Sequence, residues 1–248
     1  MSEQNNSRDH HSVEHVFQEK ERVGKLSQIR ELVFGAQDGL LVPLGVISSI
    51  AGAFNNNHIV IVVGISEALA GAFSMATGAY LASQAQRQVH KAEINKERMA
   101  IKKYTEDEKK ELELVFQKEG LTKRDSVKVV TIIAKSPVSF FNTMVQKELG
   151  LEPEPPGNPL KDAILVGLSY ILSAIIPLAP YFFFTGQTAI IISILLTLIA
   201  LFGIGIMKGR VASLPYIKSG LQVLFVGAGS GIGGYFLGKL LPHVLGIK

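Results

Sequence analysis

Residues 188–207 read TAIIISILLTLIALFGIGIM and contain no charged side chain. A helix of this length is about 30 Å long, which matches the hydrocarbon thickness of a bilayer. Core helices of soluble proteins are usually shorter and carry a polar face. This stretch therefore predicts a transmembrane helix, and it decides the class of fold.

Four more apolar runs are long enough to cross a bilayer. They are Leu32–Phe54, Ile59–Ala82, Ala163–Phe184 and Ile217–Leu241. The composition agrees, because 47% of the 248 residues are hydrophobic and only 19% are charged. We expect an all-α polytopic membrane protein with five transmembrane helices, including Thr188–Met207.

The positive charges predict the orientation in the membrane. Of the 25 Lys and Arg residues, all but Lys239 and Lys248 fall in residues 1–31, 83–162 and 208–218. Lys and Arg accumulate in cytoplasmic loops, so the N-terminus and the long connector are predicted to be cytoplasmic. The net charge of +4 is then a result of topology and needs no nucleic-acid partner. The predicted regions are a cytoplasmic N-terminal segment at 1–31, transmembrane helices 1–2 at 32–85, a cytoplasmic helical domain at 86–160 and transmembrane helices 3–5 at 161–248.

The connector is long enough to form a small helical domain inserted between the second and third spans. Good helix formers fill Gln84–Lys103, and a Thr-x-x-Glu capping box at Thr105 and Glu108 predicts a helix over Thr105–Glu119. Apolar residues at helical spacing predict a third helix over Thr122–Leu149, with Pro137 marking a turn or a kink.

Two carboxylates lie inside apolar runs, Asp38 in the first and Glu67 in the second. A charged side chain in hydrocarbon costs a few kcal/mol or more, so each must face protein or water. The alternatives are a functional site or, for Asp38, a structural residue near the interface and, for Glu67, a solvated carboxylate near the outer mouth. We favour function more strongly for Asp38.

Asp38 and Met75 are predicted to lie at one depth. Asp38 lies about 9 Å, and Met75 about 10 Å, from the cytoplasmic ends of their spans, at 1.5 Å per residue. A carboxylate with a thioether suits a transition metal such as Fe²⁺ better than Mg²⁺ or Ca²⁺. Taken alone, a methionine in an apolar helix is more often a packing residue.

The connector holds acidic residues that share helix faces: Glu93 and Glu97, Glu108 and Glu111, and Met144 with Glu148. Brought together, these residues would form an oxygen-rich site for a divalent cation, with one sulfur ligand. Without further information a solvated charged face is the more common explanation, because lysines are interleaved. The chain has no Cys, which excludes thiolate ligands and disulfides. It also offers no Ser/His/Asp or H-E-x-x-H arrangement, so we do not expect an enzyme.

Two motifs resemble the vacuolar iron transporter family, which includes the yeast-type vacuolar iron and manganese importer and plant nodulin-like members. The first span contains Arg30-Glu-Leu-Val-Phe-Gly-Ala-Gln-Asp38-Gly-Leu, and the second contains Ala70-Gly-Ala-Phe-Ser-Met75-Ala-Thr-Gly78-Ala-Tyr80. The similarity extends from about Arg30 to Leu241 and includes Pro177, Pro180 and Leu224–Gly227.

This resemblance implies a homodimer that moves Fe²⁺, and often Mn²⁺, out of the cytosol in exchange for protons. It implies that Asp38 and Met75 are membrane ligands and that Glu31 is the acidic residue at the cytoplasmic mouth. It also implies ligands in the connector. These are Glu97, Glu108, Glu111, Met144 and Glu148. The implied location is the cell membrane in a prokaryote, or a vacuolar or other endomembrane in a eukaryote. No prosthetic group is expected, and Zn²⁺ remains open as a further cargo.

The chain departs from the family pattern at three positions. Two expected carboxylates are replaced by Ala79 and Ala100, and the second methionine of a pair is replaced by Val145. Ala79 lacks the carboxylate that would bind metal or a proton beside Met75. Glu67 is only a distant substitute for that carboxylate. The alternative function is therefore a membrane-anchored metal buffer or sensor that does not transport.

Overall fold

The computed structural model describes the backbone of residues 2–54, 56–154 and 157–245, and side chains from Gln28 onward apart from several positions in the last helix. Within this described part every regular element is a helix. The chain divides into two compact units, which are described separately. The first unit is Met1–Tyr80 with Pro159–Lys248, and the second unit is Leu81–Asn158.

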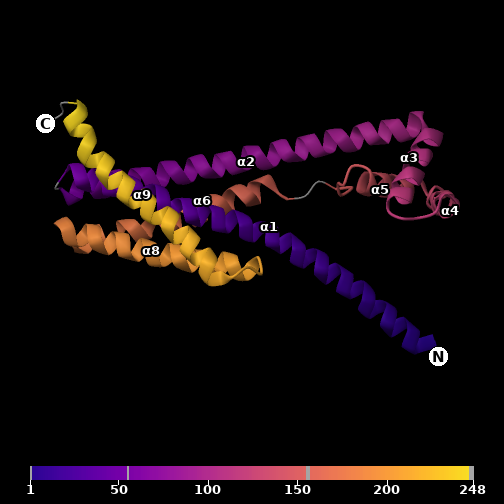
Figure 1. The fold of residues 1–248 in the computed structure, drawn as a ribbon, viewed down its shortest axis with the longest axis horizontal. Coiled ribbons are helices and arrows are strands. Elements are labelled where there is room, and N and C mark those ends of the chain that lie inside the picture. Colours follow the sequence, from indigo (N-terminus) through magenta and orange to yellow (C-terminus); the bar gives the residue numbers. More distant parts are fainter. Residues whose placement is uncertain (1, 55, 155–156, 246–248) are drawn as a thin grey trace. The chain divides into compact units, whose positions relative to one another are not determined.

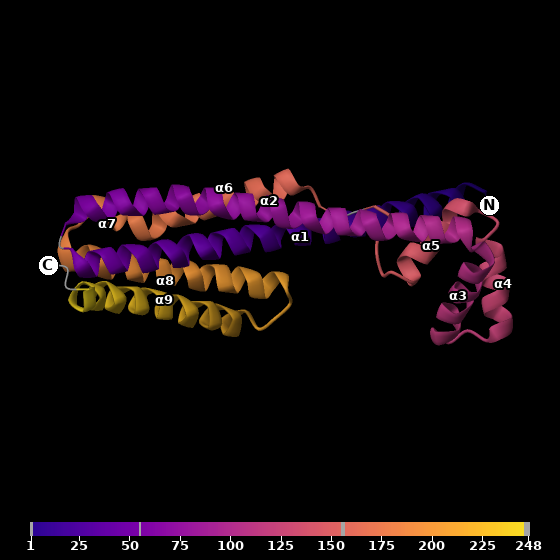
Figure 2. The same cartoon turned by 90° about the horizontal axis from the view of Figure 1, so that it is seen from above.

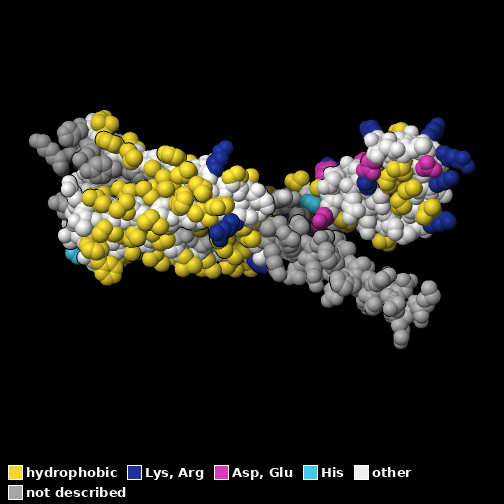
Figure 3. All heavy atoms as spheres, turned by 60° about the horizontal axis from the view of Figure 1, so that its bottom comes forward, with side chains coloured by type: hydrophobic (Ala, Val, Ile, Leu, Met, Phe, Trp, Pro, Cys, Tyr) yellow, Lys and Arg dark blue, Asp and Glu magenta, His cyan; other side chains and the backbone are white. Residues whose placement is uncertain are grey.

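The first unit is a bundle of long helices. It contains α1 (Ser2–Ala53), the beginning of α2 (Asn57–Lys103), α6 (Pro159–Leu178), α7 (Pro180–Phe183), α8 (Gly186–Val211) and α9 (Tyr216–Leu245). Helix α1 packs against α6 and α9, and α8 packs against α9 (Figures 1 and 2). Hydrophobic side chains cover much of the surface of this unit (Figure 3). Such a surface suits a lipid environment.

Four helices of the described part are long and apolar enough to cross a membrane. They lie at Gln28–Ala53, within Asn57–Lys103, at Pro159–Phe183 and at Gly186–Val211. They overlap the first four predicted spans almost completely, and only Phe54 and Phe184 lie beyond the helix ends. Helix α9 contains the predicted fifth span, but several of its side chains lie outside the described residues, so the count of five remains a prediction.

Helices α1 and α6 approach each other at the level of Asp38. A Cβ atom at Gly39 would collide with the backbone of Tyr170, and its distance from the Tyr170 Cα would be 2.8 Å. Only a residue without a side chain fits there, and the two backbones can therefore touch. The Asp-Gly pair of α1 is thus seated directly against α6.

The predicted third span is divided in two. Helix α6 ends at Leu178 and α7 begins at Pro180, whose ring cannot continue the preceding helix. Pro177 lies in the last turn of α6, and its carbonyl accepts a hydrogen bond from Ser193 Oγ of α8 at 2.6 Å. The side chain of α8 thereby satisfies a carbonyl near the break.

The second unit is formed by the end of α2 with α3 (Thr105–Lys118), α4 (Lys123–Ile133) and α5 (Pro137–Lys147). A small apolar core of side chains from α3, α4 and α5 holds these helices together. Its buried members are Leu112, Val130, Phe140 and Met144. The chain that leaves α5 returns to α2, where the His90 ring contacts the Glu152 carbonyl at 2.7 Å.

Two expected features of this unit differ in the structure. Thr122–Leu149 does not form one helix, because it is divided at Pro137, where a turn or a kink was predicted, and Pro137 takes the first position of α5, where its missing N–H costs nothing. Ser136 caps α5 by accepting a hydrogen bond from the Ser139 N–H. The capping box at Thr105 does not form either: Tyr104 occupies the cap position, and the Thr105 hydroxyl donates to the Ile101 carbonyl at 2.7 Å.

Helix α2 is continuous where the sequence suggested a span followed by a separate helix. No Gly or Pro occurs between Ala79 and Lys103, so nothing interrupts the helical hydrogen bonds. Its 47 residues correspond to about 70 Å, more than twice the thickness of the hydrocarbon. Only part of α2 can therefore lie in a membrane, and the part after Tyr80 belongs to the second unit.

Candidate metal centre

Three carboxylates from three parts of the second unit converge. Glu97 lies on α2, Glu108 on α3, and Glu148 directly after α5, and one oxygen atom of each lies within 4.8 Å of the other two. We call these residues the acidic cluster. A group of carboxylate oxygens at such spacing has the composition of a site for Fe²⁺, Mn²⁺ or another divalent cation.

The apolar core of the unit brings the acidic cluster together. Glu108 lies one turn before Leu112 on α3, and Glu148 lies one turn after Met144 on α5. Leu112 and Met144 pack against each other's helices in the core, so the carboxylates next to them are carried to the same end of the interface. Burial of the core thus supplies the free energy that holds like charges close together.

Two members of the acidic cluster are shielded from solvent, and each has an oxygen without a hydrogen-bond donor in the described part of the chain. Glu97 is 6% exposed and Glu108 is 7% exposed. Glu97 Oε1 and Glu108 Oε2 are buried and have no hydrogen-bond partner among the described residues. A buried polar atom without a partner costs free energy, and a buried charge costs more. The unsatisfied oxygens are the strongest sign that this cluster receives a cation or protons.

Burial and mutual repulsion raise the pKa values of the cluster. Burial is the larger cause for Glu97, followed by Glu148, Glu108 and Glu111, and together they raise its pKa to about 7. The pKa of Glu108 is raised by burial and then by Glu111, Glu148 and Asp107. The pKa of Glu148 is raised by burial and by Glu111. The cluster therefore holds protons near neutral pH more readily than ordinary carboxylates do.

Glu111 and Met144, which were also predicted ligands, have different surroundings. Glu111 is exposed and lies outside the trio, although its charge acts on all three members. Met144 is 0% exposed and packs in the apolar core with Phe140 and Val130. Its role as a sulfur ligand remains a prediction.

Two carboxylates of the first unit lie inside its apolar runs, and one of them, Glu67, is paired with a tyrosine. The Tyr170 hydroxyl of α6 donates a hydrogen bond to Glu67 Oε1 of α2 at 2.5 Å. Asp38 of α1 is half-buried. Sequence reasoning did not single out Tyr170. The available signal was a phenol within an apolar span, since a buried tyrosine hydroxyl usually has a polar partner.

Met75 and Glu31 occupy contrasting positions. Met75 is half-buried and packs against the buried group formed by Ala72, Tyr170 and Ala174. Glu31 forms an ion pair with the adjacent Arg30 at 2.6 Å, on the part of α1 where the described side chains begin. Binding of one ion by Asp38 and Met75 remains a prediction. Binding of metal by Glu31 remains a prediction as well.

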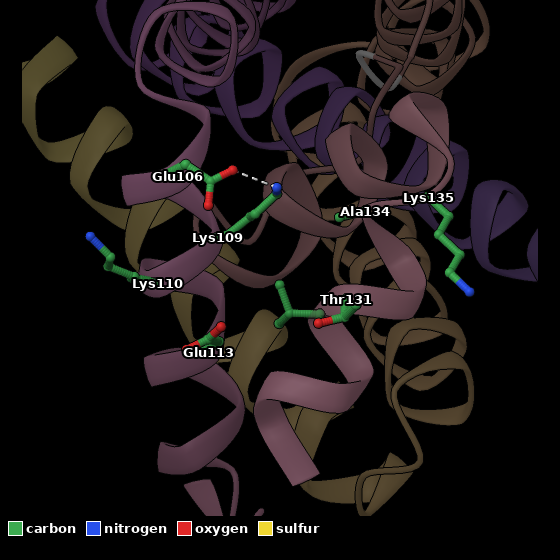
Figure 4. Close-up of a pocket in the computed structure, with 8 residues that line it drawn as sticks. Glu106, Lys109, Lys110, Glu113, Thr131, Ala134 and Lys135 are labelled. Atoms are coloured by element: carbon green, nitrogen blue, oxygen red, sulfur yellow. Dashed lines mark hydrogen bonds and ion pairs between the residues drawn. The ribbon is translucent and has the colours of Figure 1, made fainter. Parts of the chain in front are cut away.

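A pocket between α3 and α4 has a different character from the acidic cluster (Figure 4). Its rim carries Lys109, Lys110 and Lys135, and Glu106 is paired with Lys109 at 2.7 Å. The apolar residues Val130 and Ala134 also line it. Three lysines line this pocket and one of them is paired with Glu106, which does not suit a cation, so the candidate metal centre is the acidic cluster.

The fold is that of a helical membrane protein, and its second unit carries three carboxylates whose oxygens are close enough to hold a metal ion. The sequence profile of the VIT family matches residues 29–239, which is most of the chain. The chain therefore belongs to the VIT family.

Curated relatives cover most of the chain and most of their own length. Vacuolar iron transporter 1 of Arabidopsis thaliana is 30% identical over 236 residues, 95% of this chain and 92% of the relative. Vacuolar iron transporter 1 of Eucalyptus grandis is 32% identical over 201 residues, 81% of each chain. The vacuolar iron transporter of Plasmodium falciparum (isolate 3D7) is 28% identical over 225 residues, 87% of this chain and 82% of the relative.

Proposed function

We propose that this protein transports divalent transition metal, Fe²⁺ and also Mn²⁺, out of the cytosol across its membrane in exchange for protons. Membership of the VIT family and relatives named vacuolar iron transporters support metal transport. The observation that carries the proposal is the acidic cluster, in which two buried carboxylate oxygens have no partner among the described residues.

In this proposal the second unit lies in the cytosol and collects metal. Glu97, Glu108 and Glu148 supply oxygen ligands that Fe²⁺ and Mn²⁺ accept. A bound cation would satisfy the unpartnered oxygens and offset both the burial and the repulsion that together raise the pKa of Glu97 to about 7. Metal would therefore displace protons from the cluster.

The first unit provides the path across the membrane. Asp38 and Glu67 are carboxylates at membrane depth, and each can bind either a cation or a proton. Met75, with Asp38, would add a soft sulfur ligand that favours Fe²⁺ over Mg²⁺. Binding along the path must be moderate, because a tightly held ion could not leave. We further propose a homodimer, in which the exposed apolar residues of α2, Leu69 and Phe73 among them, contact the partner copy or lipid.

The test is transport by the purified protein in proteoliposomes. Fe²⁺ under reducing conditions, Mn²⁺ and Zn²⁺ are offered to oriented vesicles, and a trapped dye reports the internal pH. The proposal expects Fe²⁺ and Mn²⁺ flux coupled to a proton movement in the opposite direction. Flux without a pH change removes the exchange, and absence of flux with all three metals removes transport.

A membrane-anchored metal buffer or sensor is the second candidate. It is favoured by Ala79, which leaves no carboxylate beside Met75. It is also favoured by the acidic cluster, because all three of its members lie within the second unit. The full-length protein separates the two functions, because a buffer binds Mn²⁺ with the affinity of the cluster and gives no flux. Flux that depends on Asp38 excludes the buffer.

A further inference from the structure

We propose that Tyr170 is a positioning residue that fixes the Glu67 carboxylate in one orientation and leaves only one of its oxygens available to a passing cation or proton. This inference rests on the proposed transport function for its consequence. The contact itself is a property of the first unit.

The Tyr170 side chain bridges two helices that are far apart in sequence. It is 1% exposed, and its hydroxyl donates to Glu67 Oε1 at 2.5 Å across 103 residues of sequence. The backbone of Tyr170 packs directly against Gly39 of α1, because Gly39 has no side chain to separate the two helices. The Tyr170 side chain therefore begins next to the Asp38–Gly39 pair and ends at Glu67.

Gly71 makes the space that the hydroxyl occupies. It lies one turn after Glu67 on α2, and a Cβ atom there would collide with the Tyr170 hydroxyl. The same Cβ would lie 2.6 Å from Tyr170 Cζ and 2.9 Å from Glu67 Oε1. The niche thus admits the pair only because residue 71 has no side chain.

The two oxygens of Glu67 have unequal surroundings. Oε1 accepts the hydrogen bond from Tyr170, whereas Oε2 is buried and has no partner among the described residues. A carboxylate can bind a divalent cation through one oxygen or through both. With Oε1 engaged, Glu67 offers Oε2 alone, which gives a weaker contact of the kind that a transported ion can leave.

The key variant is Tyr170→Phe, which removes the hydroxyl and keeps the ring. We expect the maximal Mn²⁺ transport rate to fall about tenfold or more, because hydrogen bonds to charged groups contribute strongly and a freed carboxylate can hold the ion with both oxygens. Mn²⁺ affinity of the acidic cluster should not change. Tyr181→Phe is the matched control, since Tyr181 is also buried in this unit and its hydroxyl has no carboxylate partner in the described part.

A double-variant cycle shows whether Tyr170 acts through Glu67. If it does, Glu67→Gln and the double variant Tyr170→Phe/Glu67→Gln transport equally slowly. Independent, multiplying losses would overturn the proposal, and so would an unchanged rate in Tyr170→Phe. Gly71→Ala should reproduce the loss, whereas Gly203→Ala, where a Cβ meets nothing within 4 Å, should not.

An infrared measurement tests the contact without transport. The carboxylate band that disappears in Glu67→Gln should shift in Tyr170→Phe and stay in place in Tyr181→Phe. An unshifted band overturns the pair. A shifted band in a protein that carries no metal flux would instead reject the transport function and leave the pair intact, so the two failures are distinguishable.

Discussion

The acidic cluster and the Glu67–Tyr170 pair place carboxylates in opposite surroundings. In the cluster three carboxylates face one another, and two of their oxygens have no donor among the described residues. In the pair one carboxylate has a phenol donor, and only one oxygen is left without a partner. The cluster therefore depends on a cation or on protons for its stability, whereas Glu67 is already held in place by the protein.

This difference corresponds to two tasks in the proposed transport. A collecting site should bind metal firmly and release protons as it does so, which repelling carboxylates with raised pKa values achieve. A site on the path should bind weakly and in a defined geometry. Substitutions in the second unit should therefore change the affinity for metal, and substitutions in the first unit should change the transport rate.

The largest effect is expected at Asp38. Asp38→Asn keeps the shape of the side chain and removes its charge, so we expect Mn²⁺ transport to fall about 100-fold or to background, because a cation in the membrane loses its neutralising partner. Mn²⁺ binding to the second unit should be unchanged. Transport into proteoliposomes and calorimetric binding to the same preparation measure the two properties. Undiminished flux would remove Asp38 from the mechanism.

A second, smaller effect is expected at Glu108. Glu108→Gln removes one buried ligand, and we expect Mn²⁺ affinity of the full-length protein to fall about 10- to 100-fold, with a smaller loss of transport at saturating metal. Glu106→Gln is the matched control on α3, because Glu106 is exposed and paired with Lys109. Equal losses in both variants would mean that the surface charge of α3, and not the cluster, attracts the metal.

The pH dependence of binding should separate the two units further. The pKa of Glu97 is about 7, so it is mostly protonated at pH 6 and mostly ionised at pH 8. Metal must displace that proton at pH 6, and we expect Mn²⁺ affinity to increase about tenfold from pH 6 to pH 8. Calorimetry in buffers of different ionisation enthalpy measures the released protons. Glu97→Gln should flatten this dependence, whereas Tyr170→Phe should leave it intact.

The membrane helices were predictable because their signal is local and strong. An uncharged run such as residues 188–207 admits few other structures, and α8 covers it completely. Helix boundaries were less accurate. Thr105 has a favourable cap sequence, but Tyr104 takes the cap position, and Pro137 divides a helix that the apolar spacing had joined.

The candidate sites were predictable only in part, because their geometry depends on tertiary contacts. The resemblance to a transporter family indicated Glu97, Glu108 and Glu148, and the structure brings these three together. The contact between Tyr170 and Glu67 joins residues that are 103 positions apart and depends on a missing side chain at Gly71. No periodicity within either helix encodes that approach.

The smallest expected effect concerns the stability of the metal-free protein. The pKa of Glu97 is raised from 4.5 to about 7 on folding, so the folded state holds a proton that the unfolded chain releases between these values. Stability therefore falls as the pH rises from about 4.5 to 7, and the loss is complete above pH 7. Glu97→Gln removes this cost, and we expect its melting temperature at pH 8 without metal to exceed that of the unsubstituted protein by roughly a few degrees.

Circular dichroism melting at pH 5 and pH 8 measures the effect, which should be small at pH 5. Added Mn²⁺ should reverse the order at pH 8, because only the intact cluster gains stability from the metal. A variant that melts lower than the unsubstituted protein at pH 8 without metal would show that Glu97 is stabilised by the fold itself, and the contrast with Glu67 would then disappear.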